Sequence, residues 1–332
     1  MLRSLRRREA AWRERVQAYE EVDRSAPDAR ERLNAKFQDV FELVLPELDE
    51  YERQLAEDVM RRLSGIQDVA SFDAYCRSVI RRAEPIVLAS PLQKAWRRLV
   101  NRHLRHPYFL LAARRAEDYL QLLKRHAAPN PEPKLDLGCA DGQVTQAFDS
   151  VLSNFIGLDI EVPSFHAGGV QLVKGDACAL PFRSNSLALI TCINVIEHVR
   201  TPQMLLKECA RCLKIGGLLF IIVPNHRFFV EAHTLLPLIS YLPSKMRDVL
   251  CRLLTNNDFE HHTALVSLED LMEMATACGF EIVGRGAFWS GNYLSGVLSL
   301  IYKGARGIMK LLKLHEKLPP SYYLVLRLGG DG

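Results

Sequence analysis

The fold of this chain is decided by Leu135-Asp136-Leu137-Gly138-Cys139-Ala140-Asp141-Gly142. This stretch predicts a short apolar strand that breaks into a turn with two glycines four positions apart, and we expect a helix to follow from Val144. Glycine adopts backbone angles that other residues avoid, and it lets a ligand approach the main chain closely. The turn therefore predicts a ligand site at the end of a strand.

The composition of the chain is that of a globular protein. It has 332 residues, of which 48% are hydrophobic and 25% are charged. No run of about 18 apolar residues is present, and the charged N-terminus is not followed by the apolar stretch of a signal peptide. The eight cysteines are scattered, and the lone C-x-x-C of Cys209 and Cys212 lacks the second ligand pair of a zinc site. These features predict buried thiols and a cytoplasmic location.

Three regions follow one another along the chain. Residues 1–126 are predicted to form a helical N-terminal extension, in which apolar residues such as Leu33, Phe37 and Val40 recur at helical spacing. Residues 127–133 form a linker with three prolines at alternate positions, which favour an extended segment. Residues 134–332 form the main domain, with apolar insertions near 234–255 and 288–314.

The main domain alternates predicted strands with predicted helices. The predicted strands are 135–137, 154–160, 170–174, 187–193, 218–223 and 280–285, and the predicted helices are 143–152, 201–213 and 267–278. Such alternation with short connections is typical of an α/β fold with a doubly wound, mostly parallel sheet.

Three features of the chain bear on the ligand. In a doubly wound sheet, ligands bind beyond the carboxyl ends of the strands. Asp159 ends the second strand 21 residues after Gly138, the spacing of an acid that binds ribose hydroxyls. Ala140 and Gln143 replace two glycines of the dinucleotide fingerprint, which disfavours a nicotinamide-dependent oxidoreductase. A carboxylate at Asp176, followed by the apolar Leu180-Pro181-Phe182, suits an adenine ring.

Several of these landmarks together resemble a known family. They are Leu135–Gly142, Gly157-Leu158-Asp159, Gly175-Asp176-Ala177, Leu180-Pro181-Phe182, Asn194-Val195-Ile196-Glu197-His198-Val199 and Leu213-Lys214-Ile215-Gly216-Gly217. In this order and spacing they resemble the class I S-adenosylmethionine-dependent methyltransferases, in particular the small-molecule branch related to ubiquinone and sterol methyltransferases. The resemblance implies a Rossmann-like seven-stranded sheet and S-adenosylmethionine as cofactor.

The resemblance also implies roles for individual residues. Asp136 and the backbone of Gly138, Cys139, Ala140 and Gly142 would hold the amino acid portion of the cofactor. Asp159 would bind the ribose with Ile160 beside it, Asp176 and Ala177 would bind the adenine, and Asn194 would line the methionine end. The family usually has glycine where this chain has Ala140, which is tolerated if alanine keeps a compatible backbone angle.

The catalytic residues are expected after the fourth and fifth strands. Methyl transfer from a sulfonium is a direct displacement, in which the enzyme aligns the reactants and a base takes a proton from the acceptor. Glu197-His198 follows the fourth strand, and we rank His198, His233 and His261 as candidates for the general base or for orienting the acceptor. No metal site is predicted from the spacing of acidic and histidine residues.

The nature of the acceptor is indicated only by exclusion and by apolar segments. No D/N-P-P-Y/F motif follows the fourth strand, which disfavours methylation of nucleobase amino groups. Residues 94–125 carry nine basic and two acidic residues but no aromatic platform, so they give no clear nucleic-acid site. The apolar insertions raise the hypothesis of a small or lipid-linked acceptor and of a peripheral membrane contact.

Two matters stay open at the level of the sequence. The main alternative is a non-catalytic protein of methyltransferase fold that recruits a partner through its helical extension. The oligomeric state is not indicated by any pattern in the chain.

Overall fold

The computed structural model describes most of the chain and divides it into two compact units. The described residues are 2–48, 50–102, 108–127, 131–140, 142–162, 169–229, 236, 238–255, 266–289, 296–311 and 313–330. The helical unit comprises Met1–Pro107, Pro163–His166 and Leu250–Asn257, and the sheet unit comprises Tyr108–Val162, Ala167–Val249 and Asp258–Gly332.

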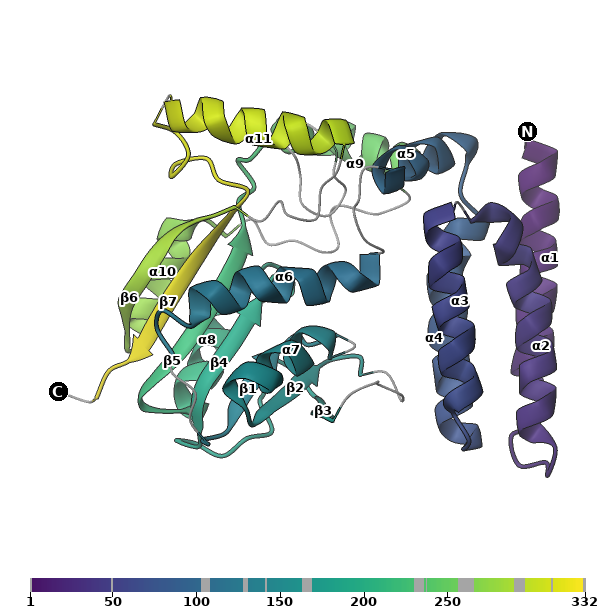
Figure 1. Ribbon diagram of the computed structural model, residues 1–332, viewed down its shortest axis with the longest axis horizontal. Helices are drawn as coiled ribbons and strands as arrows, with labels where there is room; N and C mark the ends of the chain where they lie inside the picture. The colour runs from purple at the N-terminus through teal and green to yellow at the C-terminus, as the bar shows by residue number, and fades with distance from the viewer. Residues whose placement is uncertain are drawn as a thin grey trace. The chain divides into compact units, whose positions relative to one another are not determined.

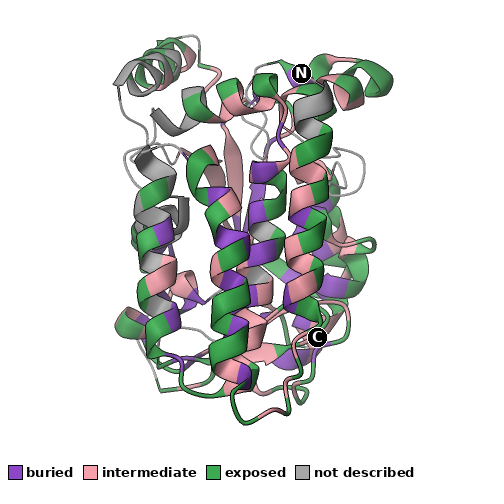
Figure 2. Ribbon diagram, turned by 90° about the vertical axis from the view of Figure 1, so that its right-hand side faces the viewer, coloured by how far each residue is buried: buried purple, intermediate pink, exposed green. Residues whose placement is uncertain are grey.

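The helical unit has a hydrophobic core of its own. Its elements are α1 (Leu2–Glu20), α2 (Ala29–Val44), the 3-10 turn η1 (Leu45–Glu47), α3 (Glu50–Gly65), α4 (Val69–Val87) and α5 (Pro91–Arg102). Leu33, Phe37 and Val40, the residues whose spacing predicted a helix, are all buried in this core. Figure 2 shows buried and exposed positions alternating along these helices, as expected when one face of each helix packs inward. The predicted helical N-terminal region is confirmed.

The sheet unit contains a seven-stranded sheet with the order β3-β2-β1-β4-β5-β7-β6. Its strands are β1 (Lys134–Leu137), β2 (Phe155–Asp159), β3 (Gln171–Lys174), β4 (Leu187–Ile193), β5 (Leu213–Pro224), β6 (Phe280–Phe288) and β7 (Ser321–Leu328). The pairs among the first five strands are parallel, and β7 runs antiparallel to both β5 and β6. This confirms the predicted Rossmann-like, mostly parallel sheet (Figure 1).

Helices cover both faces of the sheet. Alternation along β5 divides its side chains, because successive residues of a strand point to opposite faces. Leu219 and Ile221 pack with α8 (Pro202–Cys212) and α10 (Leu268–Ala277), in a layer that also buries Cys209 and Cys212. Phe220 and Ile222 pack on the other face with α6 (Tyr108–Leu123) and α7 (Gln143–Leu152). The layers hold the strand ends, and with them the site, in fixed register.

The structure differs from the sequence-based description at two places. The six predicted strands are present, but the sequence pattern did not predict β7, and only the resemblance implied a seventh strand. Helix α6 was predicted within the extension of residues 1–126, whereas the structure groups it with the sheet unit. The physical reason is packing, since Tyr119 and Leu123 of α6 are buried against the sheet together with Phe148.

Four further elements complete the sheet unit or border it. They are the 3-10 turns η2 (Ile196–His198) and η3 (Ile239–Tyr241) and the helices α9 (Ser244–Leu254) and α11 (Gly296–Leu311). The last three fall within the segments predicted as apolar insertions. Within the described residues, no helix is both long enough and apolar enough to cross a bilayer.

Candidate active site

The turn after β1 lies where the strand order of the sheet reverses. β1 pairs with β2 on one side and with β4 on the other, and both pairs are parallel, so the carboxyl ends of all three strands meet at one edge. Gly138, Ala140 and Gly142 have φ angles of +76°, +49° and +80°. A Cβ added to Gly138 would lie 2.1 Å from Cγ2 of Val195. Glycine is therefore required at 138, and the turn presents main chain with few side chains.

Asp136 supports this turn from below. It is 3% exposed, and its two carboxylate oxygens accept hydrogen bonds from the hydroxyls of Thr145 and Thr191, at 2.6 and 2.7 Å. Burial raises the pKa of Asp136 to about 6, against the opposing effect of the two threonine hydrogen bonds. Because both oxygens are engaged inside the protein, the side chain holds β1 to α7 and β4, and its predicted role toward the cofactor stays a prediction.

Asp159 joins the end of β2 to the same turn. Its Oδ2 accepts a hydrogen bond from the backbone N–H of Ala140 at 2.8 Å, and its Oδ1 accepts one from the N–H of Glu161 at 3.0 Å. The carboxylate is only half-buried, and each of its oxygens has a further lone pair. The neighbouring Ile160 is 67% exposed. A partly exposed acid thus stands beside an exposed apolar side chain.

Asp176 and Ala177 follow β3 at the next position along this edge. The N–H of Gly175 donates to the carbonyl of Asp159 at 2.9 Å, which ties the ends of β2 and β3 together. Asp176 is exposed, and its Oδ1 accepts a hydrogen bond from the N–H of Cys178 at 2.8 Å. The structure therefore brings the predicted ribose acid and the predicted adenine acid onto consecutive strand ends.

The end of β4 is followed by the polar Asn194 and, four residues later, by His198. Asn194 is half-buried with a φ of +53°, and its N–H donates to the carbonyl of Ile222 at 2.9 Å. Among the candidate histidines, His198 lies in η2 and is exposed. His233 and His261 lie outside the described residues.

Glu197 is the residue whose environment the sequence did not reveal. It is 4% exposed, and neither carboxylate oxygen has a hydrogen-bond partner among the residues that the structure describes. Burial raises the pKa of Glu197 to about 8. The pKa of the Cys192 thiol in β4 is raised, mainly by burial and secondly by the negative charge of Glu197. The carboxyl of Glu197 therefore lies near this strand. The motif Glu197-His198 drew attention to this position, but only the fold shows that the glutamate is the buried member.

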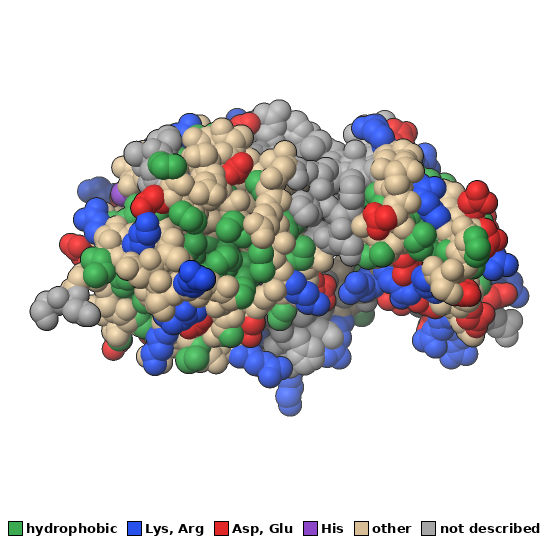
Figure 3. All heavy atoms as spheres, turned by 90° about the horizontal axis from the view of Figure 1, so that it is seen from below, with side chains coloured by type: hydrophobic (Ala, Val, Ile, Leu, Met, Phe, Trp, Pro, Cys, Tyr) green, Lys and Arg blue, Asp and Glu red, His purple; other side chains and the backbone are tan. Residues whose placement is uncertain are grey.

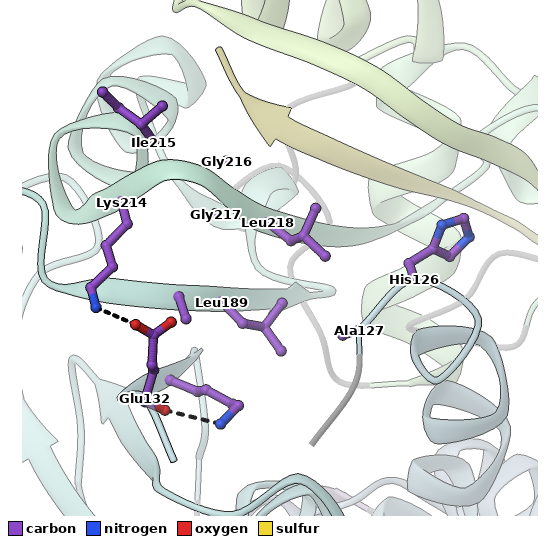
Figure 4. A pocket seen from close by; sticks show the side chains of 11 residues that line it. His126, Ala127, Glu132, Leu189, Lys214, Ile215, Gly216, Gly217 and Leu218 are labelled. Carbon is purple, nitrogen blue, oxygen red and sulfur yellow. Dashed lines mark hydrogen bonds and ion pairs between the residues drawn. The ribbon is translucent and has the colours of Figure 1, made fainter. Parts of the chain in front are cut away.

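A hollow of about 370 Å³ lies at the opposite edge of the sheet, near the amino ends of the strands. It is lined by His126, Ala127, Glu132, Lys134, Ala188, Leu189 and Lys214–Leu218. Figure 4 shows the ion pair between Lys214 and Glu132 at the border of the hollow, where Nζ of Lys214 lies 2.5 Å from Oε1 of Glu132. Figure 3 views the molecule from this end, where lysine and arginine side chains surround hydrophobic ones. None of the predicted site residues lines this hollow.

The residues at the carboxyl edge fit an adenosyl cofactor. The turn with three positive φ angles lets a ligand approach the main chain, Asp159 offers an accessible carboxylate, and Ile160 offers an apolar surface beside it. An adenosyl cofactor needs accessible main chain, a carboxylate and an apolar surface of this kind. Within the described parts of the chain, no group of three or more His, Cys, Asp or Glu side chains could hold a metal ion.

Comparison with known proteins identifies the central part of the sheet unit. Residues 135–221 match the family described as "Methyltransferase domain". The chain is 32% identical over 110 residues to a ubiquinone biosynthesis O-methyltransferase of Coxiella burnetii, a match that covers 30% of this chain and 47% of that protein. It is 28% identical over 153 residues to the ubiquinone biosynthesis O-methyltransferase of Shewanella pealeana, covering 42% of this chain and 62% of that protein.

These matches are partial in length. The chain spans about half the length of the Coxiella relatives that it matches. Among solved structures, an S-adenosylmethionine-dependent methyltransferase from Archaeoglobus fulgidus aligns with a TM-score of 0.46 and 18% identity, covering 68% of this chain and 96% of that chain.

Proposed function

We propose that the sheet unit of this chain is a class I S-adenosylmethionine-dependent methyltransferase domain of the ubiquinone O-methyltransferase-like branch. We further propose that it transfers a methyl group to a small hydrophobic or lipid-linked acceptor. The observation that carries the proposal is the arrangement at one edge of the sheet. There the glycine turn, Asp159 and Asp176 end three consecutive strands of the order β1, β2 and β3.

The cofactor would lie along these strand ends. The main chain of Gly138–Gly142 would hold its amino acid portion, Asp159 its ribose and Asp176 with Ala177 its adenine. Asn194 would line the methionine end from β4. When bound, S-adenosylmethionine supplies a methyl group on a positively charged sulfur. The residues of this chain then need only align the acceptor and accept its proton.

Glu197 is proposed as the group that accepts this proton. Glu197 lies four residues after Ile193, the last residue of β4, at the edge of the sheet where the methyl group would be presented. Its carboxyl has no hydrogen-bond partner among the other described residues. A buried carboxylate with a raised pKa is a stronger base than an exposed one, and it is protonated at low pH. We therefore expect kcat/KM to rise with pH until about 8, the pKa of Glu197. His198, which is exposed, is proposed to orient the acceptor, and His233 and His261 remain candidates for the same role.

A hydrophobic acceptor is supported by two observations. The two curated relatives named above are ubiquinone biosynthesis O-methyltransferases. In addition, large apolar side chains of the sheet unit are exposed near the predicted insertions, among them Leu238, Tyr241 and Leu300.

Calorimetry with S-adenosylmethionine tests the cofactor site. The full chain should bind it, and Asp159→Ala should weaken binding by about tenfold or more, because the variant loses the acceptor of ribose hydroxyls and the contact with Ala140. Glu281→Ala, which removes an exposed acid of β6, is the matched control and should bind like the unchanged protein. Absence of cofactor binding by the unchanged chain would refute the proposed function.

A labelled-methyl experiment tests the acceptor class. The chain is incubated with methyl-labelled S-adenosylmethionine and either a total lipid extract or a water-soluble metabolite extract. Label in extracted lipids supports a hydrophobic acceptor, and label in the soluble fraction alone contradicts that part of the proposal. Cofactor binding without label in either fraction would favour a non-catalytic interaction protein of the same fold.

A further inference from the structure

One face of α11 is held on the sheet unit by an aromatic cluster. The ring of Tyr302 contacts Trp289 edge to face with centroids 5.7 Å apart, and Trp289 makes a similar contact with Phe228 at 5.8 Å. The indole N–H of Trp289 donates to the carbonyl of His315 at 3.1 Å, which ties the segment after the helix to the same cluster. The helix is therefore docked through the side that bears Tyr302.

The opposite side of α11 carries an apolar stripe, defined as Leu300, Gly304, Gly307, Ile308 and Leu311. Gly304, Gly307, Ile308 and Leu311 lie four, seven, eight and eleven residues after Leu300, so all five positions share one face of the helix. Leu300, Ile308 and Leu311 are 70%, 59% and 83% exposed, and a Cβ added to either glycine would meet no atom within 4 Å. Three large aliphatic side chains thus stand in solvent along a single stripe.

A basic flank runs beside this stripe, defined as Lys303, Arg306 and Lys310. All three residues are exposed, and Lys313 follows just beyond the helix. The sequence of 296–311 contains no acidic residue. The guanidinium of Arg306 also lies 5.9 Å from the centre of the Trp289 ring, which sets the flank between the docked face and the apolar stripe. The helix therefore presents positive charge and apolar surface side by side.

The chemistry of this surface selects its partner. A helix with aliphatic side chains on one stripe and cations at its margin matches the boundary between acyl chains and anionic headgroups. A protein partner would need a groove lined with acids beside apolar residues, whereas an anionic bilayer offers both groups everywhere on its surface. Figure 1 shows α11 at the end of the sheet unit toward which the arrows of β4 and β5 point, the same end as the candidate site.

We propose that the apolar stripe and basic flank of α11 dock on the surface of an anionic lipid bilayer. The consequence, which rests on the proposed function, is that a lipid-linked acceptor would reach the carboxyl edge of the sheet from the bilayer on which the helix lies.

Sedimentation of the full chain with vesicles tests the docking. The chain should bind vesicles of phosphatidylcholine mixed with phosphatidylglycerol, and bind vesicles of phosphatidylcholine alone at least about tenfold more weakly. A triple variant, Leu300→Asn with Ile308→Asn and Leu311→Asn, should weaken binding to the mixed vesicles by about tenfold or more. Lys303→Glu with Lys310→Glu should weaken it similarly and remove its dependence on salt.

Matched controls separate this surface from general exposure. Met204→Asn replaces an apolar residue of α8 that is 45% exposed, and Arg183→Glu reverses an exposed charge elsewhere on the sheet unit. Neither should change vesicle binding. Each variant is checked by circular dichroism and by calorimetry with S-adenosylmethionine, because a correctly folded variant should retain the cofactor affinity of the unchanged chain.

Three results would overturn the docking proposal. The first is absence of binding to mixed vesicles, and the second is unchanged binding by the folded triple variant. The third is a dimer that forms through the apolar stripe without vesicle binding, which would identify a second copy of the chain as the partner. Cofactor binding without vesicle binding refutes the docking and leaves the proposed function standing. Vesicle binding without cofactor binding does the reverse.

Discussion

Asp136 and Glu197 are two buried acids whose hydrogen bonding differs. Asp136 lies in β1 and Glu197 follows β4, its parallel neighbour, and they are 3% and 4% exposed. Two threonine hydroxyls donate to Asp136, while no other described residue donates to Glu197. The pKa of Asp136 is accordingly raised only to about 6, whereas that of Glu197 is raised to about 8, in both cases by burial.

The difference separates a structural acid from a functional one. A buried carboxylate is costly unless hydrogen bonds replace the water it has lost. Asp136 receives that replacement from its own fold and helps to hold three elements together. Glu197 does not, so in the absence of a ligand it is favoured in its neutral form, and a bound acceptor can supply the missing partner. We infer that the fold tolerates the unsatisfied acid at the one edge where a ligand is expected.

The largest expected effect comes from removing the satisfied acid. Asp136→Ala should lower the free energy of unfolding by about 3–4 kcal/mol, because it breaks two buried hydrogen bonds and removes the acceptor of the Thr145 hydroxyl and the nearer of the two acceptors of the Thr191 hydroxyl. Urea unfolding of the full chain measures this loss. Glu281→Ala, at an exposed position of β6, is the control and should change stability little. A loss no larger than that of the control would mean that Asp136 is not the structural acid of the pair.

A second variant changes the glycine turn after β1, which contacts Val195 near Glu197. Gly138→Ala should cost about 2–3 kcal/mol, since alanine is strained at a φ of +76° and its Cβ would collide with Val195, two residues before Glu197. Cofactor affinity measured by calorimetry should fall as well. Gly65→Ala, at a helix end with no atom within 4 Å of the added Cβ, is the control. Unchanged stability and unchanged affinity would show that the turn adapts without strain.

A third variant neutralises the unsatisfied acid and should be stabilising at high pH. Because the folded pKa of Glu197 is raised, its contribution to stability is fully present below the usual pKa of about 4.5 and is lost as the pH rises through about 8. Glu197→Gln carries no charge at any pH. It should therefore come close to the unchanged chain at pH near 5 and exceed it by at least about 2 kcal/mol at pH near 9.

Urea unfolding at these two pH values measures the difference, and the methyl-transfer assay accompanies it. Glu197→Gln should lose the proposed proton acceptor, so that kcat/KM falls and no longer rises toward pH 8. A stabilised variant with unchanged activity would assign Glu197 to the protein interior alone. A variant that is less stable at pH 9 would show that the carboxylate has a partner in the folded protein.

The sequence predicted the strands beside these two acids better than it predicted the surroundings of the acids themselves. The apolar runs that end in glycine, acid or asparagine placed β1, β2 and β4 within a few residues, because strand ends are marked locally. It could not distinguish the two acids, since the partners of Asp136 are 9 and 55 residues away and come together only when α7 and β4 pack beside β1. Burial and hydrogen bonding depend on such distant neighbours.

The same reason explains where the fold itself was missed. Helix α6 has the composition of the preceding helices, and only the contact of its apolar face with the sheet assigns it to the second unit. Strand β7 is recognised through its antiparallel pairing with β5 and β6, which lie far from it in the sequence. Local patterns predict elements, whereas the assignment of an element to a layer depends on long-range packing.

The smallest expected effect tests whether hydrogen bonds alone hold the pKa of Asp136 below that of Glu197. Thr145→Val removes one of the two donors and should cost about 1 kcal/mol in urea unfolding. The lost hydrogen bond favoured the charged form of Asp136, so its pKa should rise further above about 6. The loss should accordingly be greater at pH 8, where the carboxylate is charged, than at pH 4, where it is protonated in both proteins. A loss of the same size at both pH values would mean that burial, and not the threonines, makes the two acids differ.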